Sequence, residues 1–171
     1  MQNKCNWCDQ PLAPFQLRQV AKQYVTHSLC ADCTEMIFQP DSTTMQKFLD
    51  SLDAPILLMQ AEPRKVVGAN RQACELFAKE LSQIEGRRSG EVFDCVHAAS
   101  EAGCGKDAHC EKCGIKKAVD ETFASGNSFD KVATFLKIRK NHDINLYNLQ
   151  VSTEKAGDLT LLRIDQFLKK D

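Results

Sequence analysis

Apolar residues in the first half of the chain recur with two different periods. Met45, Phe48, Leu49 and Leu52 follow an i, i+3, i+4, i+7 pattern, which predicts a helix over 42–52 with one apolar face. Two short apolar runs, 54–60 and 65–70, then predict strands. A second helix is predicted over 71–85, with Asn70 as its N-cap and Gly86 after its end. One face of this helix carries Cys74, Phe77, Ala78 and Leu81.

The second half predicts a helix followed by three strands. The helix begins near Ile115 and is closed by Gly126, and its stripe contains Ile115, Ala118, Val119, Thr122 and Phe123. Strands are predicted at 128–138, 144–153 and 159–165, with five-residue turns at 139–143 and 154–158. Strands at both ends with helices between them predict an α+β fold with a mostly antiparallel sheet.

Composition and charge narrow the classes of protein. The chain has 171 residues, 43% of them hydrophobic and 26% charged, which is typical of a globular protein. The net charge of −1 argues against nucleic acid or an anionic membrane as a partner. The N-terminus is polar, and no apolar run approaches the roughly 18 residues of a membrane span. We therefore expect a cytoplasmic protein, in which cysteines serve as metal ligands or redox groups rather than as a disulfide framework.

Four of the nine cysteines form two CxxC pairs near the N-terminus, at Cys5, Cys8, Cys30 and Cys33. Two such pairs supply the tetrahedral thiolate set of a zinc site, and the roughly 35 residues around them cannot bury much core. We expect zinc to fold residues 1–40 as a small finger. Four sulfurs leave no open position for water, so this zinc is interpreted as structural.

The second set of four has the spacing C-x8-C-x5-C-x2-C, and consists of Cys95, Cys104, Cys110 and Cys113. Gly103, Gly105 and Gly114 allow tight turns around an ion. A single CxxC pair is compatible with zinc, and irregular spacing is also common for iron–sulfur clusters. A thiol–disulfide switch is the third interpretation. His97 and His109 lie among these cysteines, although four sulfurs need no replacement ligand.

The order of elements resembles a PAS domain, the sensory module of bacterial signalling proteins, over residues 43–168. The resemblance is carried by FLDSLDAPILLM, by VVGANRQACELFAKE and by IEGRRSGEVFDC. The segments GEVFDC, GCG and CEKCG resemble a cysteine-rich subset of such sensors, and YVTHSLCADCTEMIF resembles treble-clef-like zinc fingers attached to bacterial signalling proteins. The resemblance implies a five-stranded antiparallel sheet, a pocket between sheet and helices, and signalling through dimerisation without catalysis.

These observations predict two units, a finger at 1–40 and a PAS-like domain at 41–171 with an internal four-cysteine metal site. No motif of a hydrolase, phosphate-binding loop or metalloprotease occurs in the sequence. We expect a non-enzymatic sensor of redox state or oxygen; the alternative is a ligand-binding or interaction adaptor with two structural zinc ions. The expected partners are a second copy and a signalling protein such as a sensor kinase. The helix at 42–52 either pairs two copies or packs on its own sheet.

Overall fold

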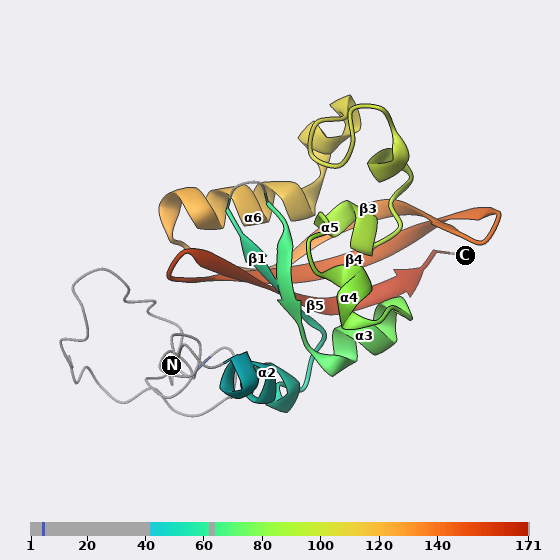
Figure 1. The fold of residues 1–171 in the computed structure, drawn as a ribbon. Helices are drawn as coiled ribbons and strands as arrows, with labels where there is room; N and C mark the ends of the chain where they lie inside the picture. The colour runs from blue at the N-terminus through green and yellow to red at the C-terminus, as the bar shows by residue number, and fades with distance from the viewer. Residues whose placement is uncertain (1–4, 6–41, 62–63, 171) are drawn as a thin grey trace.

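The computed structural model of the chain describes residues 42–61 and 64–170, together with Cys5 (Figure 1). The predicted finger at 1–40 lies outside the described residues except for Cys5. None of the described helices has the length and apolar character needed to cross a membrane.

Twelve elements follow one another along the described residues. They are α2 (Ser42–Ser51), β1 (Ile56–Gln60), β2 (Val66–Ala69), α3 (Arg71–Phe77), α4 (Leu81–Ile84), α5 (Ser89–Val92), the 3₁₀ turns η1 (Val96–Ala99) and η2 (Ala108–Lys112), α6 (Gly114–Ser125), β3 (Phe129–Lys140), β4 (Asp143–Ala156) and β5 (Leu159–Lys169).

The strands form one five-stranded sheet in the order β2-β1-β5-β4-β3, with every neighbouring pair antiparallel. The predicted α+β class and the five strands are confirmed. The turns predicted at five residues each are shorter in the structure, because Lys140 already pairs with Asp143 and Ala156 with Leu159. Each turn is therefore two residues long, and Gly157 supplies the positive φ of 60° that such hairpins require.

Alternation along the strands divides the core between the two faces of the sheet. Leu57 and Met59 of β1 pack in the larger cluster, which includes residues of α3, α4, α5 and α6. Ile56 and Leu58 point to the opposite face and pack against α2. The apolar stripe of α2 is buried there, so it packs on the sheet of its own chain. Cys5 is fully buried in the same smaller cluster.

The prediction of a single helix over 71–85 was wrong, because the helix ends at Phe77 and a second one begins at Leu81. Ala78 takes up the left-handed conformation with φ of 52°, and its N–H bonds back to the carbonyl oxygens of Cys74 and Glu75. The break places Lys79 across from α5, where its Nζ donates to the carbonyl oxygen of Val92 at 2.7 Å. Alanine is a strong helix former, so no local sequence signal marks this end.

Asn70 has a larger role than the predicted N-cap. Its Oδ1 accepts hydrogen bonds from the N–H of Ala73 at 3.0 Å and of Ile56 at 2.9 Å. Its Nδ2 donates to the carbonyl oxygens of Leu49 and Ala54, and the residue is fully buried. One amide therefore joins α2, β1 and α3.

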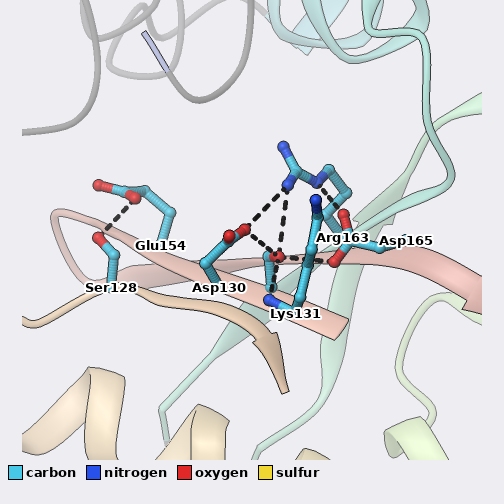
Figure 2. Close-up of polar contacts among 7 residues, drawn as sticks. Ser128, Asp130, Lys131, Glu154, Arg163 and Asp165 are labelled. Carbon is cyan, nitrogen blue, oxygen red and sulfur yellow. Dashed lines mark hydrogen bonds and ion pairs between the residues drawn. The ribbon is translucent and has the colours of Figure 1, made fainter. Parts of the chain in front are cut away.

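A polar network crosses β3, β4 and β5 on the sheet face that carries Ile56, which pairs with Arg163 (Figure 2). The Ser152 hydroxyl donates to Asp165 at 2.6 Å and accepts from the N–H of Lys131 at 3.0 Å. Arg163 donates from Nε to Asp165 at 2.6 Å. Lys131 has a positive φ of 49° at the bulge where β3 shifts its register on β4. The network satisfies polar groups at this bulge, which accounts for it structurally.

Candidate metal centre

The segment between α5 and α6 contains little that could order it by apolar burial. Val96 is its one large aliphatic side chain among residues 95–113. From 94 to 114 the side chains are exposed or half-buried, except that of Cys110. Its backbone turns through η1 and η2, with Gly103 and Gly105 at positive φ of 75° and 85°. Both glycines therefore take up the backbone conformation that the predicted tight turns require, and the ion within those turns stays a prediction.

Both ends of the segment are fixed to the edge strand β3. Cys95 forms an isolated bridge with Ile138, and the N–H of Arg139 donates to the carbonyl oxygen of Asp94 at 2.9 Å. At the other end, the N–H of Gly114 donates to Oγ1 of Thr134 at 3.2 Å. A Cβ on Gly114 would lie 2.7 Å from the Thr134 Cβ, so close approach to β3 requires glycine here. In Figure 1 the segment lies beside the start of α6.

Backbone N–H groups lie near the sulfurs of the second cysteine set. The N–H of Gly105 donates to Sγ of Cys110 at 3.2 Å. Cys95 and Cys113 occupy the N-cap positions of η1 and α6, and neither side chain accepts a capping hydrogen bond there. Nearby N–H groups still act to lower the pKa of these two thiols, and the N–H of Gly90 in α5 does so for Cys104. Such N–H groups act in favour of thiolates, the form that binds metals.

Burial and neighbouring charges act in opposite directions on these thiols. Burial raises the pKa of Cys95, Cys104 and Cys113, since it disfavours the charged form. The N–H donors lower it, and so do the positive charges of Arg88 beside Cys104 and Lys116 beside Cys113. A bound cation would offset the cost of burying these thiolates, so the donor set fits a metal ion or cluster.

The four thiols lie in one neighbourhood, but no three of their sulfur atoms lie within 4.8 Å of one another. Cys104 interacts electrostatically with Cys110 and Cys113, and Cys95 with Cys104 and Cys113. Among the described residues, the group of three ligand atoms that all lie within 4.8 Å of one another is a different one, His97, Asp107 and His109.

Arg88 ties the cysteine segment to α5, because its Nη1 donates to the carbonyl oxygen of Cys104 at 2.9 Å. A cavity of about 20 Å³ lies beside this contact, lined by Met59, Arg64, Arg88, Ser89, Cys104, Gly105, Lys116 and Val119. That is room for about one water molecule, whereas ligand pockets measure roughly 300–1,000 Å³.

A more open hollow of about 300 Å³ lies on the surface beside Cys95. Residues of α5 and η1 line it, together with Arg139 of β3. Small molecules in solution therefore have a path to the neighbourhood of this sulfur.

His97 and His109 face one another on η1 and η2. Their rings stack with centroids 4.2 Å apart and planes at 15°. Nδ1 of His109 lies 2.9 Å from Oδ1 of Asp107, and the hydrogen bonds from the backbone and side chain of His109 lower the pKa of Asp107 to about 2. Sequence reasoning considered the two histidines and missed Asp107, which lies two residues before His109.

The remaining cysteines are placed as follows. Of the predicted finger ligands Cys5, Cys8, Cys30 and Cys33, only Cys5 is among the described residues. Cys74 is half-buried on α3 against the larger core cluster, and its pKa is raised by burial and by the nearby carboxylates of Glu80, Asp50 and Glu75. These contacts agree with the predicted place of Cys74 on the apolar face of its helix.

The chain was compared with known proteins in three ways. No protein-family model matches the sequence, and no curated protein matches it. Solved structures of similar shape include a LOV protein of Rhodobacter sphaeroides, with a TM-score of 0.48 and 12% identity over 70% of this chain and 62% of that one. This chain thus spans less than two thirds of that protein.

Two further solved structures cover more of their own chains. The photoactive yellow protein domain of the sensor histidine kinase Ppr from Rhodospirillum centenum has a TM-score of 0.47 and 14% identity, over 71% of this chain and 92% of that one. The PAS domain of nitrogen regulation protein NR(II) from Vibrio parahaemolyticus has a TM-score of 0.45 and 13% identity, over 71% of this chain and 96% of that one. The five-stranded antiparallel sheet with its flanking helices is the architecture that the resemblance to a PAS domain implied.

Proposed function

We propose that this chain is a non-enzymatic, cytoplasmic PAS-type sensory module whose signal originates at a metal centre held by Cys95, Cys104, Cys110 and Cys113. The observation that carries the proposal is that four thiols interact electrostatically with one another in a segment that has almost no buried apolar side chains. Apolar burial cannot order such a segment, whereas bonds from its thiolates to one metal centre would do so.

Zinc and an iron–sulfur cluster remain the two candidate occupants of this centre. Zinc would order the segment and supply no redox chemistry of its own, while an iron–sulfur cluster would accept and release electrons. In both cases the protein residues have the same task. They hold four thiolates on the edge of β3 and balance their charge with Arg88 and Lys116.

The position of the cysteines gives a route from the centre to the rest of the domain. Cys113 occupies the N-cap position of α6, and the backbone of Cys95 forms a β-bridge with Ile138 in β3. Loss of the centre would free the residues that fix the start of α6 and the edge of the sheet. The surfaces of these two elements are the ones we expect a partner to recognise.

Oxidation of the CxxC pair is the step by which a zinc-bound centre would respond to redox state. The sulfurs of Cys110 and Cys113 would form one S–S bond and lose two electrons to a peroxide. The peroxide takes up two protons and leaves as water and an alcohol. Two of the four metal ligands are thereby removed, and the segment loses its cross-link.

Under the same proposal, the N-terminal cysteines Cys5, Cys8, Cys30 and Cys33 bind a structural zinc in a finger at 1–40, and 41–171 forms the PAS-like unit. Replacing Cys8 by Ser removes one thiolate, and we expect the zinc content to fall by one equivalent with the PAS core still folded. An unchanged zinc content would contradict this assignment.

The alternative is an interaction adaptor in which both metals are structural zinc. The inner cavity of about 20 Å³ is too small for a ligand, so a ligand-binding form of this role would have to use the open surface hollow of about 300 Å³ beside Cys95. The proposed partners are a second copy of the chain and a signalling protein such as a sensor kinase. Because the apolar stripe of α2 is buried in its own chain, a dimer would have to use another surface. Sedimentation at high concentration tests the pairing, and a monomer would remove it.

The experiment that tests the central proposal is metal analysis with visible absorption on anaerobically purified full-length protein. We compare the wild type with Cys104→Ser, and use Cys74→Ser as the matched control. The proposal expects Cys104→Ser to lose the metal of this centre and Cys74→Ser to retain it. Iron, inorganic sulfide and visible absorption identify a cluster, and a colourless zinc protein identifies zinc. Equal metal content in all three proteins would contradict the proposal.

A further inference from the structure

Three ligand-bearing side chains outside the cysteine set meet on the outside of the segment. His97 belongs to η1, His109 to η2, and Asp107 is the N-cap of η2. Oδ1 of Asp107 lies 2.9 Å from Nδ1 of His109 and 3.7 Å from Nδ1 of His97. One ligand atom of each residue lies within 4.8 Å of the other two.

We propose that His97, Asp107 and His109 form a second metal site, which binds a divalent transition cation such as Zn²⁺ or Ni²⁺ independently of the cysteines. Two imidazoles and one carboxylate are ligands that suit these ions. Bonds of 2.0–2.2 Å in a tetrahedral site place the ligand atoms about 3.4 Å apart. The two Nδ1–Oδ1 distances lie on either side of that value.

Binding would require a small rearrangement of the two rings. The ion takes the place of the proton between Asp107 and His109, and this proton leaves to solvent. The rings must open from their stack at 15°, so that both lone pairs point at one ion. Solvent reaches the site because the side chain of His109 is 71% exposed. Three protein ligands leave a further position for water.

A purely structural account explains part of this arrangement. Asp107 caps η2 by accepting the N–H of His109 at 2.9 Å. The cap does not require an imidazole at position 97, whose ring comes from η1 and stacks over His109. Asn is as good an N-cap as Asp, so Asp107→Asn keeps the cap and removes the anionic ligand.

The proposed ion would join η1 to η2 from the solvent side. Cys95 is the N-cap of η1, and Cys110 lies within η2. A cation here would therefore order the turns that carry two of the thiols without using any sulfur.

The test is a calorimetric titration of Ni²⁺ into the untagged full-length chain, after its tightly bound metal has been counted. His97→Ala, His109→Ala and Asp107→Asn are compared with the wild type. His142→Ala is the matched control, because His142 is an exposed histidine in the turn between β3 and β4. We expect one Ni²⁺ equivalent in the wild type and in the control. Its affinity should fall at least about tenfold in each histidine variant and about 10–100-fold in Asp107→Asn.

Three results would overturn the proposal. The first is that the wild type and the two histidine variants take up the same amount of Ni²⁺. The second is that the His142→Ala control loses the ion as well. The third is that Asp107→Asn binds Ni²⁺ as tightly as the wild type. Circular dichroism on each variant confirms that it is folded. The tightly bound metal is counted separately, so failure of the cysteine centre and failure of this site give different results.

Discussion

The sheet with its helices and the cysteine segment are ordered by different means. In the larger core cluster, Leu57, Ile138 and Leu162 are fully buried, and burial of each such side chain contributes about 1.5–3 kcal/mol. Between 94 and 114, Cys110 is the one buried side chain. The first region can be held by apolar packing, and the second needs bonds of another kind. Ligand bonds to a metal, worth on the order of 10 kcal/mol, are sufficient.

The largest expected effect of a single substitution lies in the first region. Asn70→Ala removes the N-cap of α3, at about 1 kcal/mol, and leaves buried backbone groups without partners, at about 1–3 kcal/mol. We expect the free energy of unfolding to fall by about 2–4 kcal/mol, measured by urea denaturation.

Arg71→Ala is the control, because this neighbouring side chain is 74% exposed. Its effect should stay within about 0.5 kcal/mol. If Asn70→Ala behaved like Arg71→Ala, the hydrogen bonds of Asn70 would not hold α2, β1 and α3 together.

The second prediction concerns the cysteine segment alone. A Cβ on Gly90 would lie 2.6 Å from Sγ of Cys104, so Gly90→Ala displaces this ligand without changing any cysteine. We expect the affinity of the centre to fall about 10–100-fold, or about 1.4–2.7 kcal/mol, in competition with a chelator.

Ser89→Ala leaves a methyl side chain one residue earlier, without adding a Cβ, and serves as the control, with an affinity close to that of the wild type. The urea midpoint of the sheet should change little in both variants. Equal affinities for Gly90→Ala and the wild type would mean that Cys104 is not a ligand.

The third prediction concerns the junction between the two regions. Nζ of Lys79 donates to the carbonyl oxygens of Glu91 and Val92 and to Asp94 at 2.7 Å. We expect Lys79→Met to lower the free energy of unfolding by about 1–2 kcal/mol. This is the lower end for hydrogen bonds to a charged donor, because the Lys79–Asp94 pair is partly exposed. We expect hydrogen exchange to increase in α5 more than in β4. Lys117→Met, on the exposed side of α6, should leave both rates unchanged.

The sequence was informative where one local pattern decides the structure. The stripe from Ile115 to Phe123 with Gly126 predicted α6 closely, since periodicity and the C-cap agree. The strand predicted over 128–138 corresponds to β3, in which Thr134, Leu136 and Ile138 alternate as buried residues. The break at Ala78 was missed because it depends on Lys79 reaching α5, a contact between residues far apart along the chain.

The candidate site shows the same division. Cysteine spacing predicted Cys95, Cys104, Cys110 and Cys113 as one set, and the four thiols do interact electrostatically with one another. Gly90, which packs against Sγ of Cys104, comes from α5, and the cluster of Asp107 with two histidines forms only when η1 and η2 fold together. Residue spacing alone carries no signal for such contacts.

Thiol labelling of the native full-length protein decides whether one metal centre holds these four cysteines. Anaerobic protein is labelled with and without a chelator, mass spectrometry locates the labelled cysteines, and the released metal is measured. We predict that Cys95, Cys104, Cys110 and Cys113 become reactive together with metal release, while Cys74 reacts equally in both samples. Full labelling of the four without chelator and without metal release would contradict the claim.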